Sequence, residues 1–483
     1  MSTDAKTAGK SFGHHIEWFR QKWGLPLAIL CMLAIWFAPT PAGLTLVAKK
    51  ALVLFAGIFV MYLCESMPLA VVSVAVLPLA VLLKVVPMSV ALEGYSASTV
   101  YLLYGSFILA AAMVKTNLAE RITFIILSKI GSSTRNITLG ITLCNIVLNF
   151  LVPSATARTA ILLPVCLGII DLFQTQGRTR FSAGLLLTLA FTSLTISAGT
   201  LPGTVANPVA VEFIVKAGGP DISYMQWLIL GYPPALLMTF VTWWCIYKVF
   251  KPEHDEIPGG QDFVKARLAT FGPMSSEERR TLVVFLGVVV LWLTGDITKI
   301  DVTISALIGA TALFLPGFGV LNWSDANKAV SWQILLIAGG GISLGVILLK
   351  TGAAKWLASA IFSALGLHGL STLVLLIIVM LVVQYLHIFF VGTTAMVSAI
   401  IPVVLAIGAE AGIPPIVLAL PAGMLIGAYP LLMFYGTNSN ILVYGTGRVN
   451  IGDFPRVGVL LCTIACGVYA LCAATYWRWL GFF

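Results

Sequence analysis

Long apolar runs separated by short breaks occupy most of this chain of 483 residues. Two of them, Leu370–Phe390 and Val457–Trp477, are about long enough to cross a bilayer as a helix. Only 10% of the residues are charged, whereas a soluble domain carries about 25%. In lipid, backbone polar groups must be satisfied within a helix or a closed barrel, and the short alternating strands of a barrel do not occur here. The sequence therefore predicts an all-α polytopic membrane protein.

The net charge of +9 does not indicate nucleic-acid binding, because the basic residues are spread thinly between apolar runs. Lys49, Lys129, Arg178 and Arg180 are typical of loop residues that anchor spans at the membrane surface. The eight cysteines form no CxxC pair, which argues against a zinc site and a disulfide framework. Without an HExxH or a P-loop motif, we expect no enzyme activity, no metal and no cofactor.

One long polar stretch, 251–280, divides the chain into two apolar parts of similar length. We interpret this stretch as a connector between a first membrane repeat, 23–250, and a second membrane repeat, 281–483. Residues 1–22 are polar and are interpreted as an N-terminal cytoplasmic tail. The apolar run Leu25–Phe37 is expected to be the first span and not a removed signal, since it has no compact basic start or clear cleavage site.

Three motifs occur once in each half and in the same order. The run that ends at Lys115-Thr116 resembles the run that ends at Lys350-Thr351, an offset of 350 − 115 = 235. The segment 154–157 with Pro164 corresponds to the segment 392–395 with Pro402, an offset of 402 − 164 = 238. The motif Gly203-Thr204-x-x-Asn207 corresponds to Gly436-Thr437-x-x-Asn440, an offset of 440 − 207 = 233. The agreement between the three offsets indicates a duplication.

Small and hydroxyl residues at matching positions of two halves predict interrupted helices that form a transport site. An interrupted helix exposes unpaired N–H and C=O groups, which persist in a membrane only where they line a cavity or bind a ligand. The N–H ends carry partial positive charge and therefore suit anions. The alternative is that these residues mediate helix packing, where small residues are also enriched. The candidate site residues in these motifs are Ser154, Ala155, Thr156, Gly203, Thr204, Asn207, Thr393, Thr394, Gly436, Thr437 and Asn440.

Two basic residues adjoin the predicted interruptions. Arg158 follows the first one, and its planar group of donors suits a substrate carboxylate; the alternative is an arginine paired with a protein carboxylate or with backbone carbonyls. His387 precedes the second one and is either a substrate ligand or a structural donor. Glu65 would repel an anion, so we expect it to have a structural role.

At these motifs the sequence resembles the divalent anion/sodium symporter family, and within it the bacterial citrate/succinate and tartrate/succinate exchangers. The quoted segments are Cys64-Glu65-Ser66-Met67-Pro68, Pro153–Arg158, Tyr385–Ile388 and the two Gly-Thr-x-x-Asn loops. The resemblance implies inverted repeats, re-entrant hairpins and a homodimer that works by an elevator mechanism in the bacterial cytoplasmic membrane. It also implies that small di- or tricarboxylate anions bind between two Ser-Asn-Thr signatures, which map onto 154–156 and 392–394.

Both signature asparagines are replaced here, by Ala155 and Thr393. In sodium-coupled relatives those asparagines help to bind the cations, so the resemblance leaves sodium possible but disfavoured. Fixed positive charge at Arg158 and His387 could instead neutralise a dicarboxylate. Because an empty carrier with uncompensated charge would return slowly, we expect sodium-independent anion exchange. The alternatives are a sodium-coupled dicarboxylate or sulfate symporter and, from another class, an anion channel.

Overall fold

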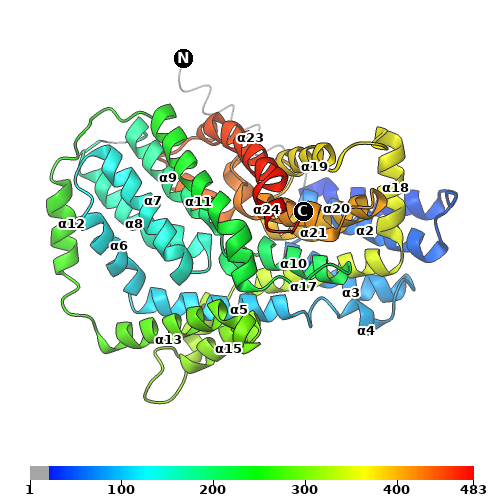
Figure 1. Cartoon of the computed structure of the whole chain (residues 1–483), viewed down its shortest axis with the longest axis horizontal. Coiled ribbons are helices and arrows are strands. Elements are labelled where there is room, and N and C mark those ends of the chain that lie inside the picture. Colours follow the sequence, from blue (N-terminus) through cyan, green and yellow to red (C-terminus); the bar gives the residue numbers. More distant parts are fainter. Residues whose placement is uncertain (1–20, 176) are drawn as a thin grey trace.

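The computed structural model describes residues 21–175 and 177–483, and all regular elements in these residues are helical (Figure 1). Residues 1–20 of the predicted N-terminal tail lie outside the described residues. Seven of the described helices are long and apolar enough to cross a membrane, and six further apolar helices are shorter. The chain is therefore a multi-pass membrane protein, as its composition predicted.

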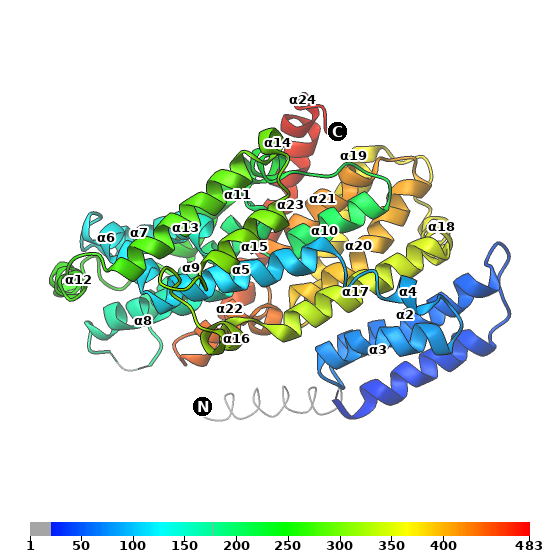
Figure 2. The ribbon, with the colours of Figure 1, turned by 90° about the horizontal axis from the view of Figure 1, so that it is seen from below.

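The helices before the polar stretch begin with one whose described part is Gln21–Phe37. They continue as α2 (Leu46–Cys64), α3 (Leu69–Leu82), α4 (Met88–Ala91), α5 (Ser98–Lys115), α6 (Leu118–Ser128), α7 (Thr134–Leu151), α8 (Ala155–Asp171), α9 (Arg180–Ser197), η1 (Leu201–Gly203), α10 (Ala206–Lys216) and α11 (Tyr224–Val249). The polar stretch contains α12 (Gly260–Ala269). Figure 2 shows α2 and α3 at one end of the molecule and α6 and α12 at the other.

The helices after the polar stretch repeat this order. They are α13 (Ser276–Leu293), α14 (Gly295–Thr298), α15 (Val302–Ala312), α16 (Trp323–Ala329), α17 (Trp332–Lys350), α18 (Ala353–Leu365), α19 (Thr372–Leu386), α20 (Thr393–Glu410), α21 (Pro415–Ala428), η2 (Phe434–Gly436), α22 (Asn438–Gly445), α23 (Asp453–Ala474) and α24 (Tyr476–Trp479). In both halves a long helix and a shorter helix precede a helical hairpin, an interrupted helix and a second long helix.

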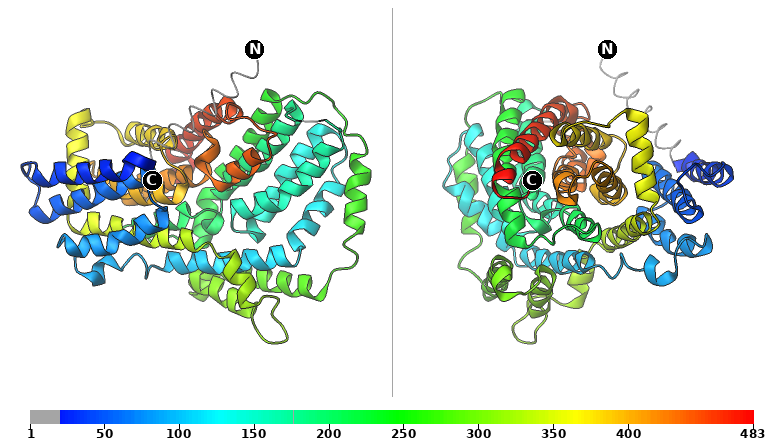
Figure 3. Two further views of the ribbon diagram at one scale, coloured as in Figure 1. Left: turned by 180° about the vertical axis from the view of Figure 1, so that it is seen from behind. Right: turned by 45° about the vertical axis from the view of Figure 1, so that its right-hand side comes forward.

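The most deeply buried span is α9. Its first turn is fixed by a capping box, in which the Thr179 hydroxyl accepts from the Ser182 N–H and the Ser182 hydroxyl accepts from the Thr179 N–H. Although its sequence is apolar enough to face lipid, 94% of the span is buried. It is surrounded by α7, α8 and α11, so other helices and not lipid cover its apolar surface (Figure 3).

Close packing between helices of the two halves depends on glycine. A Cβ atom at Gly340 in α17 would lie 2.3 Å from the backbone oxygen of Ser73 in α3, a contact that only a shift of one helix could relieve. Small residues at such positions allow membrane helices to approach closely, which strengthens their van der Waals contact.

We therefore expect Gly340→Ala to lower the thermal unfolding temperature of the detergent-solubilised protein, because overpacking costs roughly 1–3 kcal/mol. The matched control is Gly467→Ala in α23, where nothing lies within 4 Å of the added Cβ. This control should keep or raise the unfolding temperature, because alanine favours helix. Equal unfolding temperatures for Gly340→Ala and the unmodified protein would contradict the packing argument.

Candidate functional site

Each half contains a helical hairpin whose tip interrupts the helical backbone. The first hairpin joins α7 to α8 through Val152, Pro153 and Ser154, and the Ser154 hydroxyl caps α8 by accepting from the Ala157 N–H at 3.3 Å. The second joins α19 to α20 through residues 387–392. Gly392, which precedes α20, has a φ of 88°, a conformation that glycine adopts without the strain that a Cβ imposes. Both predicted interruptions before an apolar helix are present.

The two Gly-Thr-x-x-Asn loops interrupt the helix that follows each hairpin, and the same hydrogen bonds hold both loops. Asn207 Nδ2 donates to the carbonyl oxygens of Ser197 at 3.0 Å and Thr200 at 2.9 Å. Asn440 Nδ2 donates to those of Pro430 at 2.9 Å and Met433 at 3.0 Å. The offset is 233 for every member of the set, since 440 − 207, 430 − 197 and 433 − 200 agree. The duplication read from the sequence therefore extends to single hydrogen bonds.

The two interrupted helices run antiparallel. The first half of one contacts the second half of the other, because α9 packs against α22 and α10 packs against α21. Each hairpin packs on both, α8 on α9 and α22, and α20 on α21 and α10. The two hairpin tips and the two loops thus meet in one place, although they are far apart in the sequence.

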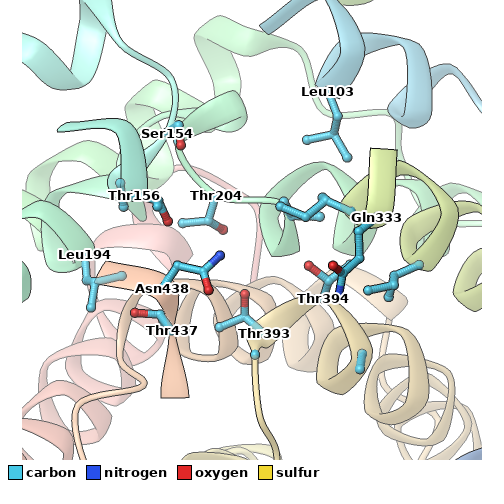
Figure 4. Close-up of a pocket in the computed structure, with 18 of the residues that line it drawn as sticks. Leu103, Ser154, Thr156, Leu194, Thr204, Gln333, Thr393, Thr394, Thr437 and Asn438 are labelled. Carbon is cyan, nitrogen blue, oxygen red and sulfur yellow. The ribbon is translucent and has the colours of Figure 1, made fainter. Parts of the chain in front are cut away.

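A cavity of about 220 Å³ lies where the tips and loops meet (Figure 4). Eight of the thirteen predicted site residues line it: Ser154, Ala155, Thr156, Gly203, Thr204, Thr393, Thr394 and Thr437. Four helices begin at its wall, since their first residues or N-caps line it: α8 at Ala155, α10 at Val205, α20 at Thr393 and α22 at Asn438. The four converging N-termini each direct partial positive charge toward the cavity, which suits an anion.

Arg158, which was predicted to contact a substrate, does not line this cavity. Its side chain is fully buried behind the first tip. There Nη1 donates to the Val152 carbonyl oxygen at 2.5 Å, and Nη2 donates to the Ser193 carbonyl oxygen at 2.8 Å. Nη2 also donates to the Ser197 hydroxyl. The physical reason is that the long side chain turns back from the first turn of α8 toward two carbonyl oxygens, of Val152 in the first tip and of Ser193 in α9. These oxygens also accept from the Ser154 N–H and the Ser197 hydroxyl. The alternative of an arginine paired with backbone carbonyls describes the observed geometry.

His387 is likewise absent from the cavity wall and lies behind the second tip. Its Nδ1 is 2.9 Å from the Gln384 carbonyl oxygen, and its Nε2 is 3.1 Å from the Ile426 carbonyl oxygen. A carbonyl oxygen only accepts, so both contacts are hydrogen bonds only when both ring nitrogens carry a proton. The Ile426 carbonyl corresponds to that of Ser193, because 426 − 193 is again 233. Each hairpin is therefore joined to the neighbouring interrupted helix by a basic side chain.

The three other predicted residues that are missing from the wall support the loops from behind. Asn207 and Asn440 are fully buried, and their amide groups donate to loop carbonyls. Gly436 packs against Pro430, whose carbonyl oxygen would lie 2.9 Å from an added Cβ. These three residues were predicted to bind substrate, and the structure places them behind the cavity wall.

Sequence reasoning missed several polar residues of the wall, including Asn438, Gln333, Ser106 and Tyr435. Asn438 directly follows Thr437, so its place in the second loop was the available signal. Gln333 and Ser106 come from α17 and α5, and no local motif marks them. Glu65 is the only charged residue at the wall, and among the described residues no three His, Cys, Asp or Glu side chains are grouped to hold a metal.

Comparisons with known proteins agree over the whole chain. The family model described as sodium:sulfate symporter transmembrane region matches residues 20–483. A protein of Cupriavidus necator named only as a membrane protein is 30% identical over 95% of this chain and 93% of its own length. The putative malate transporter YflS of Bacillus subtilis is 28% identical over 95% and 96%.

A third relative, the sodium-dependent dicarboxylate transporter SdcS of Staphylococcus saprophyticus, is 28% identical over 82% of this chain and 80% of its own length. Among solved structures, the YdaH transporter of Alcanivorax borkumensis has a similar fold, with a TM-score of 0.53 and 13% identity. This likeness covers 96% of this chain and 98% of that one.

Proposed function

Since the chain belongs to the family of the sodium:sulfate symporter transmembrane region, the divalent anion/sodium symporters that its motifs resemble, we propose that it transports small di- or tricarboxylate anions across the bacterial cytoplasmic membrane. The family and the relatives are transporters and not enzymes. Relatives named for malate and for dicarboxylates support this class of substrate, which includes succinate, malate, 2-oxoglutarate, citrate and tartrate.

The observation that carries the proposal is the convergence of four helix N-termini on one cavity of about 220 Å³. Backbone N–H groups and the hydroxyls of Ser154, Thr156, Thr393 and Thr437 offer donors on opposite sides of the cavity. A molecule with a carboxylate at each end could accept from both tips at once. Donors on opposite sides of one cavity indicate a site that binds the anion, which a channel does not need.

The proposed coupling is sodium-independent exchange. Arg158 places a positive charge behind the first tip, and His387 would place a second one behind the other tip when both of its ring nitrogens carry a proton. Both side chains contact backbone carbonyl oxygens of the kind that bind cations in transporters with interrupted helices. Their role is thus proposed to be fixed counter-charge and not direct contact with the substrate. An empty site leaves both charges uncompensated by an anion, which disfavours movement of the empty carrier through the membrane.

Sodium coupling is the second candidate, because the SdcS relative is named as sodium-dependent. It requires cation sites formed by backbone carbonyls without the signature asparagines, which are Ala155 and Thr393 here. It also requires carbonyls that Arg158 and His387 do not already occupy.

Uptake of labelled succinate into proteoliposomes tests both candidates. We expect rapid uptake into vesicles that contain unlabelled succinate, equal in external sodium and potassium, and at least about tenfold less uptake into empty vesicles. Uptake into empty vesicles that needs a sodium gradient would contradict the exchange proposal and favour symport. Non-saturable flux would favour a channel, and no flux of any of the five named anions would contradict carboxylate transport.

Three further proposals concern architecture. The antiparallel interrupted helices support inverted repeats with the boundaries 23–250 and 281–483, joined by the connector 251–280. The two hairpins and two interrupted helices would move together as the transport body of an elevator. A homodimer follows from the family resemblance, and the mass of the detergent-solubilised particle checks it.

A further inference from the structure

A second cavity of about 500 Å³ adjoins the central cavity and reaches exposed residues such as Lys328. The two share five lining residues, Phe107, Ser154, Thr156, Ile334 and Asn438, so the outer cavity begins at the first hairpin tip and the second loop. Its inner walls are formed largely by small apolar residues such as Ala110, Ala111 and Ala157. We interpret this cavity as an access path between the candidate anion site and one face of the protein.

The mouth of the access path carries a net positive charge. Lys115 at the end of α5 donates to Asp325 in α16 at 2.5 Å, and this hydrogen bond lowers the pKa of the Asp325 carboxyl below its ordinary value. Lys328, one turn further along α16, is exposed and also lines the path. Within the described part of the chain Lys328 forms no ion pair, whereas Lys115 and Asp325 neutralise each other. One uncompensated lysine thus stands at the mouth.

This mouth lies on the face that carries most of the basic loop residues. Hydrogen bonds join its loops to one another: Arg121 near Lys115 binds the Gly272 carbonyl of the connector, and Arg280 binds the Phe318 carbonyl of the loop before α16. Other basic residues at this face are Arg178 and Arg448 in loops, Arg180 at the start of α9 and Arg267 in α12. Among the described residues, the opposite face carries fewer basic residues at its helix ends and loops, including Lys299, Lys350 and Lys355. The distribution assigns the mouth to the cytoplasm.

We propose that Lys328 is an electrostatic guide that draws dianionic substrates from the cytoplasm into the access path and so sets selectivity for anions at that face. The proposal rests on the proposed function, because it concerns access to the same site. Lys328 acts by position and charge and does not bind the substrate at the central cavity.

The second half provides an internal comparison. Lys350 is the last residue of α17, just as Lys115 is the last residue of α5. Lys350 donates at 2.5 Å to Glu93, which lies just after α4, and Lys115 donates in the same way to Asp325 in α16. Both pairs join the two halves of the chain. The Lys350–Glu93 pair lines neither the central cavity nor the access path. Lys355 is exposed near Lys350 and therefore serves as a matched control. Lys355→Glu changes the net charge of the protein by the same amount as Lys328→Glu.

Thiol labelling measures the potential in the path without any transport. Ala160 lines the path and is exposed, so Ala160→Cys can be labelled after the three partly exposed native cysteines, Cys31, Cys64 and Cys472, are replaced by alanine. The readout is the ratio of the rates with an anionic and a cationic methanethiosulfonate. We expect Lys328→Glu to lower this ratio about tenfold at low ionic strength, and less than twofold at 1 M salt, where the Debye length is about 3 Å.

The control Lys355→Glu should leave the labelling ratio unchanged. An unchanged ratio in Lys328→Glu would overturn the proposal, as would a change of equal size in the control. Because this readout does not involve carboxylates, it tests Lys328 even if the protein moves a different anion.

Transport measured from each side completes the test. In inverted membrane vesicles, Lys328→Glu should raise the KM for succinate about five- to tenfold at low salt with little change in kcat. In right-side-out vesicles the KM should be unchanged. A larger KM on both sides or on neither would overturn the assignment of Lys328. Absence of succinate transport by the unmodified protein in either preparation would instead contradict the proposed function.

Discussion

Arg158→Ala should abolish succinate exchange while leaving the protein in the membrane. The substitution removes the charge behind the first tip and three charge-assisted hydrogen bonds, to the Val152 and Ser193 carbonyls and the Ser197 hydroxyl. Hydrogen bonds to charged groups contribute about 1.5–3 kcal/mol each, and 1.4 kcal/mol corresponds to a factor of ten. We expect exchange to fall by at least about a hundredfold in proteoliposomes that contain equal amounts of protein.

Arg158→Lys separates charge from geometry. An ammonium group keeps the charge, but it cannot reach the Val152 carbonyl with one nitrogen and the Ser193 carbonyl with another as the guanidinium does. We expect the lysine variant to fold and to exchange at least about tenfold more slowly. The matched control is Arg180→Lys, whose side chain is 61% exposed beside Glu253 and which should exchange normally. Full exchange by Arg158→Lys would contradict the assigned geometry.

The effect of sodium on uptake by Arg158→Ala tests most directly whether Arg158 takes the place of a cation. Removal of the guanidinium leaves oxygen atoms of Val152, Ser193 and Ser197 facing the vacated space, and carbonyls of interrupted helices bind sodium in other transporters. Partial recovery of uptake by sodium, but not by choline, would support the idea that Arg158 takes the place of a cation. Normal exchange by Arg158→Ala without sodium would refute it.

The second large effect is expected at the two loop asparagines. Asn207→Leu and Asn440→Leu each remove an amide that donates to two buried loop carbonyls. The Thr200 and Met433 carbonyls still accept from the N–H groups of Gly203 and Gly436, so each variant leaves one loop carbonyl, that of Ser197 or Pro430, without the amide donor. A buried polar group left unsatisfied costs about 1–3 kcal/mol. We expect both variants to unfold several degrees lower and to lose most of their exchange, and to do so to a similar extent because the two loops are equivalent.

Aspartate at either position should be no better than leucine, because its carboxylate would face carbonyl oxygens and donate nothing. The control is Asn450→Leu, an exposed asparagine on a loop. Differential scanning fluorimetry and proteoliposome exchange measure the two properties separately. If Asn207→Leu were harmless and Asn440→Leu severe, the two loops would not be functionally equivalent.

The sequence alone determined the class of protein, the duplication and the places where helices are interrupted. These features have local causes: apolar runs without charge can only face lipid or other helices, and small residues at matching positions leave backbone groups available to a ligand. The repeated motifs at Lys115 and Lys350, Ser154 and Gly392, and Asn207 and Asn440 all lie at corresponding places in the two halves.

Only the tertiary structure decided where individual side chains point and which residues from distant helices complete the site. Arg158 lies one turn from Ser154, and its direction depends on carbonyls of α9, far along the chain, so local spacing could not distinguish substrate contact from support. Asn438 and Asn440 share one loop, yet one lines the cavity and the other holds the loop, because successive residues at the start of a helix point in different directions. Gln333 reaches the wall because α17 packs beside α20, a contact between helices that no local pattern encodes.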